Sequence, residues 1–154
     1  MIPAMNKKRI RPSTITAQQR RLLFSTMIGR WLPPLVWMAV IFVFSAQPSL
    51  PHAPELWLEL LVKKGGHAWA YGVLAWLYWR ALRPYGKSQP AVWRGVCIAL
   101  AVMYALSDEY HQTFVPGRNG NLLDVVVDGL GAGIAMGLER WRSVRVRAGR
   151  SRPV

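Results

Sequence analysis

The sequence predicts an all-α protein: an integral membrane bundle of four transmembrane helices, with a short interfacial amphipathic helix between the first and the second. Its 154 residues suffice for one compact domain. Hydrophobic residues make up 52% of the chain and include eight Trp, too many for a disordered basic protein. These residues fall in blocks separated by Lys and Arg. None of the four blocks has the charged face that a soluble bundle requires, so the membrane bundle is favoured.

The first span is expected to begin at Pro33 and Pro34 and to end before Gln47 and Pro48. Proline is tolerated in a first helical turn because its N–H would lack a partner there anyway. Residues 1–30 are predicted to form a basic cytoplasmic arm that ends in an interfacial stretch. No cleavage site follows the span, which therefore resembles an uncleaved signal anchor.

The interfacial helix is predicted over residues 55–64, which read ELWLELLVKK. Glu55, Glu59 and Lys63 recur every four residues and line one face, while Leu and Trp residues line the other. Such an amphipathic segment suits the boundary between lipid and water.

The remaining spans are predicted from His67 to Trp79, over about 91–107, and over 122–138. Each apolar core is slightly shorter than the ~20 residues that cross a bilayer, and flanking aromatic residues extend it. Residues 31–140 would form the transmembrane domain, and residues 141–154 an Arg-rich cytoplasmic tail. The aromatic residues suited to the headgroup region are Trp31, Trp57, Trp93 and Trp141.

The charge distribution predicts the orientation. Seventeen Lys and Arg residues fall in the two termini and the turn between the second and third spans, and only three fall on the other side. By the positive-inside rule, both termini are expected on the cytoplasmic side of a bacterial inner (plasma) membrane. The net charge of +13 resides in loops and not on a folded polar surface, so we expect no nucleic-acid partner.

Cysteine and histidine patterns exclude several kinds of site. The single cysteine, Cys97, lies inside an apolar block and permits no internal disulfide. Neither His67 nor His111 belongs to an H-x-x-x-H or H-E-x-x-H motif. We therefore expect no metal and no cofactor.

Four antiparallel helices would bring the polar residues at the span ends to one extracytoplasmic face. Ionisable groups inside a membrane cost about 2.5–3.5 kcal/mol at a helix centre, and they mark functional sites by default. Ser45 and Gln47 are expected only to hold the bundle together, and one of the two histidines only to pack. The predicted ligand-binding set is Lys64, His67, Glu109, Gln112, Arg118 and Asp124.

These residues also carry a family resemblance. The run SDEYHQTFVPGRNGNLLDVVVDGLGAGIAMG, from Ser107 to Gly137, resembles the signature of the VanZ-like family. That signature has an acidic residue, Gln three positions later, F-x-P-x-R, and Asp six positions after the Arg. An upstream K-x-x-H-x-x-x-Y pattern is also present. The matching residues are Glu109, Gln112, Phe114, Pro116, Arg118 and Asp124, with Lys64, His67 and Tyr71 upstream.

The resemblance covers about residues 32–138. The family is known mainly by its membrane topology and by the teicoplanin-resistance phenotype of its namesake. The resemblance therefore implies an envelope membrane protein and no particular reaction. Asp128 falls where family members often carry Asn or Asp, which argues against a catalytic role for it.

Three functions remain open. The first is binding of a lipophilic or lipid-linked anionic molecule, such as a lipid headgroup or a glycopeptide, through Arg118. The second is a membrane enzyme acting on a lipid headgroup, with Glu109 or Asp124 as general base and His67 or His111 as acid. A transporter is disfavoured because the chain is small and has no internal repeat.

A row of small residues in the last span predicts close helix packing, within the bundle or in a homo-oligomer. It consists of Gly129, Gly133 and Gly137.

Overall fold

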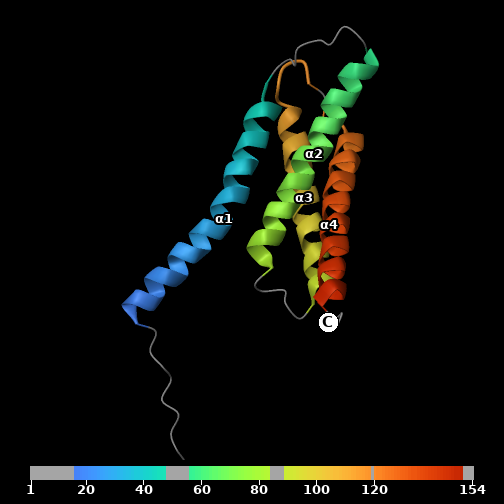
Figure 1. Cartoon of the computed structure of the whole chain (residues 1–154). Helices are drawn as coiled ribbons and strands as arrows, with labels where there is room; N and C mark the ends of the chain where they lie inside the picture. Colours follow the sequence, from blue (N-terminus) through green and yellow to red (C-terminus); the bar gives the residue numbers. More distant parts are fainter. Residues whose placement is uncertain (1–15, 48–55, 84–88, 119, 151–154) are drawn as a thin grey trace, which may run out of the picture.

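The structure is a computed structural model that describes residues 16–47, 56–83, 89–118 and 120–150. Within these ranges it is all-α and contains four helices and no strand. They are α1 (Ala17–Ser45), α2 (Leu56–Leu82), α3 (Pro90–Gln112) and α4 (Leu122–Arg150). Figure 1 shows α2, α3 and α4 side by side, while α1 meets them along its C-terminal half and diverges from them toward its N-terminus. The all-α prediction and the order of the four main helices are confirmed.

The prolines of α1 lie inside the helix, so the prediction that they begin it was wrong. The helix starts at Ala17 and passes through Pro33 and Pro34 without ending. Proline sets a backbone φ that suits a helix, and the cost of its missing hydrogen bond is about 3 kcal/mol. A long apolar helix tolerates that cost when neighbouring groups surround the prolines. Pro34 is indeed buried.

The separate interfacial helix was also a wrong prediction. Its residues from Leu56 onward form the first turns of α2, which continues to Leu82 through Gly65 and Gly66, while Glu55 lies outside the described residues. A glycine inside a helix costs about 1 kcal/mol relative to alanine but does not stop the helix. At the other end of the chain, α4 extends to Arg150 and includes most of the predicted tail.

Helices α2 and α4 approach closely where two glycines face each other. A Cβ atom placed on Gly131 would overlap the backbone of Ala68, and one placed on Gly72 would lie 3.1 Å from the Gly131 carbonyl oxygen. The predicted glycine row contributes less: Cβ atoms on Gly133 and Gly137 would meet nothing within 4 Å among the described residues. The close contact therefore depends on Gly72 and Gly131.

Aromatic side chains join α1 to the rest. The Trp37 indole N–H donates to the Ala70 carbonyl oxygen at 2.9 Å, and its ring meets Trp69 edge-on. The Tyr104 hydroxyl donates to the Met38 carbonyl oxygen at 2.6 Å. These contacts place the C-terminal half of α1 against α2 and α3.

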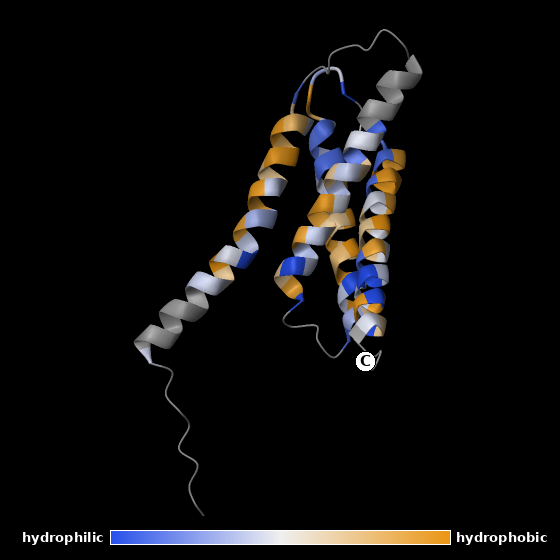
Figure 2. Cartoon of the chain, viewed as in Figure 1, coloured by the Kyte–Doolittle hydropathy of each residue, from blue (hydrophilic) through white to orange (hydrophobic). Residues whose placement is uncertain are grey.

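The described surface is apolar on its outer faces, whereas several polar side chains are buried. On α4, Leu130 and Ile134 are 61% and 63% exposed, while Asp128 is 1% exposed. Figure 2 shows hydrophobic residues along the outer faces of α1 and α4, with hydrophilic residues gathered toward the ends of the bundle. Two segments, Ser25–Ser45 and Pro90–Gln112, are long and apolar enough to cross a membrane. The other helices do not meet that test within the described residues, so four spans are not established.

Candidate functional site

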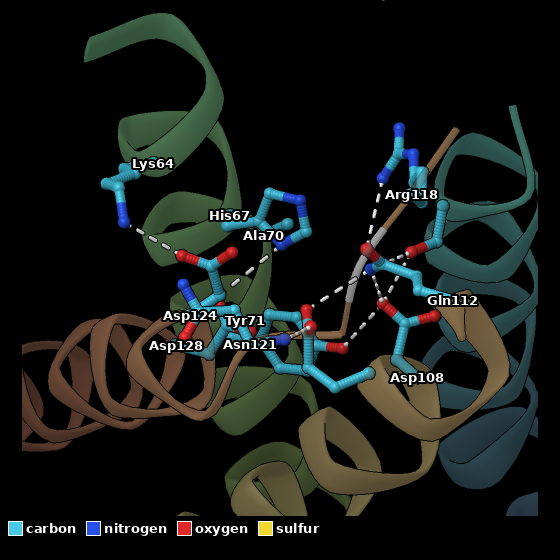
Figure 3. Close-up of polar contacts among 12 residues, drawn as sticks. Lys64, His67, Ala70, Tyr71, Asp108, Gln112, Arg118, Asn121, Asp124 and Asp128 are labelled. Carbon is cyan, nitrogen blue, oxygen red and sulfur yellow. Dashed lines mark hydrogen bonds and ion pairs between the residues drawn. The ribbon is translucent and has the colours of Figure 1, made fainter. Parts of the chain in front are cut away.

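The candidate site lies where α1 and α3 end and where α4 begins, beside the N-terminal half of α2 (Figure 3). The loop between α3 and α4 turns at Gly117, whose φ of 79° suits glycine and strains other residues. Asn121 then caps α4, because its side-chain oxygen accepts a hydrogen bond from the Leu123 N–H at 3.0 Å. This turn and cap hold Arg118 and the first acids of α4 near the end of α3.

Asp108 is the centre of a buried hydrogen-bond network. Its Oδ2 accepts the Ser45 hydroxyl at 2.6 Å, and the Tyr71 hydroxyl and the Gln112 side-chain amide each at 3.3 Å. The Gln112 amide also donates to Ser45 Oγ at 2.6 Å. Three helices thus meet at one carboxylate, which we call the Asp108 network (Ser45, Tyr71, Asp108 and Gln112).

Glu109 connects this network to α4. Its Oε2 accepts the Asn121 backbone N–H at 2.8 Å, and its Oε1 accepts the Gln112 amide at 3.2 Å. Both carboxylate oxygens of this buried side chain are therefore bonded, one to the residue before α4 and the other to Gln112 at the end of α3.

An ion pair and a histidine–carboxylate contact join α2 to α4. Lys64 Nζ donates to Asp124 Oδ1 at 2.9 Å, with the lysine side chain 40% exposed. One turn further along α2, His67 Nδ1 lies 3.6 Å from Asp128 Oδ1, and the Asp128 side chain is almost completely buried. The i, i+4 spacing places both aspartates on the face of α4 that contacts α2.

Arg118 differs from Lys64 because it bonds neutral groups. Its Nε donates to the Gln47 carbonyl oxygen at 3.0 Å, and its Nη1 donates to Gln112 Oε1 at 3.3 Å. No described carboxylate lies within ion-pair distance of its guanidinium, which is partly exposed. Among the described residues, its positive charge therefore has no paired carboxylate.

All of the predicted ligand-binding residues lie at this end of the bundle, in two adjoining groups. Glu109, Gln112 and Arg118 lie with the Asp108 network, and Lys64, His67 and Asp124 lie on the α2–α4 side. Their role in binding stays a prediction. His111 lies apart from both groups: its ring packs on Phe42 at 4.3 Å between centroids.

Sequence reasoning missed the buried partners. Asp108 was not selected although it shares a helix face with Gln112, four residues later, and that spacing was the available signal. Ser45 was assigned to packing, yet its hydroxyl bonds both Asp108 and Gln112. Tyr71 appeared in the sequence pattern without a role.

Several buried polar atoms of the site have no hydrogen-bond partner in the described structure. They include Asp108 Oδ1 and both carboxylate oxygens of Asp128. Unsatisfied buried acceptors are costly, on the order of 1–3 kcal/mol each, so such groups commonly mark a functional site. Among the described residues, no group of three His, Cys, Asp or Glu side chains is arranged to hold a metal ion.

Comparison with known proteins adds the family. Neither curated proteins nor solved structures gave a match. The family model described as VanZ/LLP1 matches residues 12–142, which is most of the chain and includes every described residue of the candidate site. The resemblance seen in the sequence is thereby confirmed, and the chain belongs to the VanZ/LLP1 family.

Proposed function

We propose that this protein is a multi-pass protein of the bacterial inner membrane that binds a lipophilic or lipid-linked anionic molecule at its extracytoplasmic face. The observation that carries the proposal is Arg118, whose guanidinium bonds only neutral acceptors among the described residues. None of the described acids nearby lies within ion-pair distance of it.

The distribution of side chains supports the membrane placement. Exposed Leu and Ile side chains run along α4 while Asp108 and Asp128 are buried, the reverse of a water-soluble helix bundle. Contiguous apolar surface on this scale is rare in soluble monomers. The positive-inside rule then puts the Arg-rich ends in the cytoplasm and the candidate site outside.

Arg118 is suited to a phosphate or carboxylate. A guanidinium presents planar donors that can bond two oxygens of one anion. Gln112 Oε1 and the Gln47 carbonyl oxygen orient that plane, and a third nitrogen, Nη2, has no hydrogen bond in the described structure. The exposed apolar side chains nearby, Phe114 and Leu122, are placed to meet the lipid part of the ligand.

The binding test uses protein in phosphatidylcholine nanodiscs and a fluorescent polyprenyl phosphate as the probe. Arg118→Gln should weaken binding at least tenfold, which corresponds to 1.4 kcal/mol. The affinity of Arg118→Lys should fall between those of the wild type and Arg118→Gln, because lysine keeps the positive charge but lacks the planar pair of donors of a guanidinium. Arg140→Gln, at the opposite end, is the matched control, and equal affinities for all four proteins would exclude this role for Arg118.

A lipophilic glycopeptide is a second ligand of the same chemical class. The family resemblance associates the fold with teicoplanin resistance, so expression of the wild-type chain is expected to raise the teicoplanin concentration that inhibits growth. The Arg118→Gln variant should lose that effect at equal membrane abundance. No difference between cells with and without the wild-type chain would remove the link to resistance.

The topology has its own test. Single cysteines in place of Thr113 and Gly149, in a Cys97→Ala background, should react with a membrane-impermeant maleimide from opposite sides of intact cells. Position 113 should label from outside and position 149 only after permeabilisation. Labelling of both positions from the same side would contradict the orientation.

A second candidate function is an enzyme acting on a lipid headgroup. It is favoured by His67, which lies 3.6 Å from an almost fully buried Asp128 whose oxygens have no described hydrogen-bond partner. A carboxylate behind an imidazole orients it for general acid–base chemistry. Mass spectrometry of polyprenyl phosphates after incubation tests this reading: turnover that Asp128→Asn abolishes without loss of binding would support it.

A homo-oligomer through the glycine row of α4 also remains a proposal. Gly133 and Gly137 leave open space where a second helix can approach, although Val102 already contacts the Gly129 position. Sedimentation in detergent should show an oligomer that Gly133→Leu dissociates.

A further inference from the structure

A groove of about 1320 Å³ extends toward the opposite end of the bundle along α2 and α4, and residues of α1 and α3 also line it. Its lining changes in character along its length. The part near the middle of the bundle is apolar, and the part toward the Arg-rich end is lined by arginines. Neither part shares a residue with the candidate site.

The apolar part has a floor and two walls. Gly72 and Gly131 form the floor where the helices meet. Trp76 of α2 and Ile134 of α4, which are 45% and 63% exposed, stand on opposite walls. From Gly131 to the arginine of α4 at position 142 the helix rises about 16 Å. That length matches one leaflet, since half of a ~30 Å hydrocarbon core is about 15 Å.

In the arginine part of the groove, little of the positive charge is paired with an acidic side chain. Its single acid, Glu139, accepts the Arg94 Nε at 2.7 Å, and the Arg94 guanidinium also lies over the Trp79 ring. That pair leaves no acid among the groove residues for the other arginines, and none of them forms an ion pair with a described residue. They are Arg30, Arg80, Arg83, Arg142 and Arg147.

The helical repeat explains why the two parts are continuous. Ile134, Leu138 and Arg142 follow one another at four-residue spacing on α4, and Trp76 and Arg80 do so on α2. Each helix therefore presents an apolar stripe that ends in arginine on the side facing the groove.

We propose that this groove binds one anionic glycerophospholipid of the leaflet at the Arg-rich end. Its phosphate lies among Arg80, Arg83 and Arg142, and an acyl chain lies between Trp76 and Ile134. An anionic headgroup complements the excess of arginine, and basic pockets between membrane helices are suited to such headgroups. The inference rests on the membrane placement proposed above but is independent of Arg118.

The test compares phosphatidylglycerol retained by the full chain in native mass spectra, after release from nanodiscs of phosphatidylglycerol and phosphatidylcholine. The wild type should retain one phosphatidylglycerol in preference to phosphatidylcholine. The double variant Arg142→Gln, Arg147→Gln should lower that retention at least fivefold. Its matched control is Arg140→Gln, Arg145→Gln, which removes two charges from the same stretch of α4 outside the groove and should leave retention unchanged.

A second measurement locates the acyl chain. Phosphatidylglycerol with brominated chains should quench tryptophan fluorescence more than brominated phosphatidylcholine, and Trp76→Phe should remove most of the difference. Equal losses in the two double variants would mean general attraction to a charged surface and would overturn the proposal, as would equal quenching by the two lipids. Arg118→Gln should change neither result, so failure here is separate from failure at the other end.

Discussion

The two ends of the bundle carry mainly opposite charges, and these charges differ in how far they are paired within the protein. At the α3–α4 loop, four acids are held by Lys64, His67 and hydrogen-bond donors of the site. At the far end, six arginines line one groove with a single glutamate. Charges that are paired within the protein fix the geometry of the surrounding side chains. Charges without such partners attract a charge of opposite sign from outside the protein. At the first end most of the charged groups are therefore held in a fixed geometry, with Arg118 as the exception, whereas most of the arginines at the second end have no described partner.

The ion pair Arg94–Glu139 should have the largest effect on stability, because both side chains are less than one-fifth exposed. Glu139→Gln leaves the Arg94 charge partly buried without a partner, and losing one member of a buried pair is strongly destabilising. We expect a loss of about 3 kcal/mol, measured by reversible unfolding in mixed micelles. A loss below about 1 kcal/mol would mean that the arginines at this end are already hydrated or bound to lipid.

Removal of the Asp108 carboxylate should cost somewhat less. Asp108→Ala leaves the Ser45 and Tyr71 hydroxyls and the Gln112 amide without their shared acceptor, and we expect about 2–3 kcal/mol. Asp108→Asn keeps one acceptor oxygen and should recover at least half of the loss. If Asp108→Ala unfolds like the wild type, the network does not fix the geometry of this end.

Gly131→Ala tests the close contact of α2 with α4, which lies between the two ends of the bundle. The added methyl group would overlap the Ala68 backbone and push α2 away from α4, which typically costs 1–3 kcal/mol, here about 2. Gly137→Ala is the control, because its methyl group meets open space inside the same helix, and it should raise the unfolding free energy by up to about 1 kcal/mol. Equal effects would show that the crossing point lies elsewhere.

The smallest effect is expected at the Lys64–Asp124 pair. The lysine side chain is 40% exposed, and exposed pairs contribute about 0–1 kcal/mol. Lys64→Gln should therefore change the unfolding free energy by less than about 1 kcal/mol in the same micelles. A loss as large as that of Glu139→Gln would remove the contrast between the two ends.

Much of the fold could be predicted from local patterns. Apolar blocks and the charges between them marked four helices, and the polar residues at their ends marked the candidate site. The failures were at boundaries. Pro33 and Gly65 look like helix ends in the sequence, but each costs only a few kcal/mol, and the long helices around them continue.

The sequence predicted which residues lie at the site better than it predicted their contacts. Arg118 and Glu109 were selected correctly as members of one end, but Asp108 was missed because nothing in the sequence shows that Ser45 and Tyr71 point toward it. Those contacts join three helices from distant parts of the chain.

The sequence by itself determined the helical class, the order of the helices and the placement of acids and arginines at opposite ends, because hydropathy and charge are properties of neighbouring residues. Only the tertiary structure decided which acid pairs with which cation, which arginines remain unpaired among the described residues, and that a groove runs along the contact of α2 with α4. Those features depend on how each helix is rotated about its axis and where it crosses the next. The close approach of Gly72 to Gly131 sets that crossing.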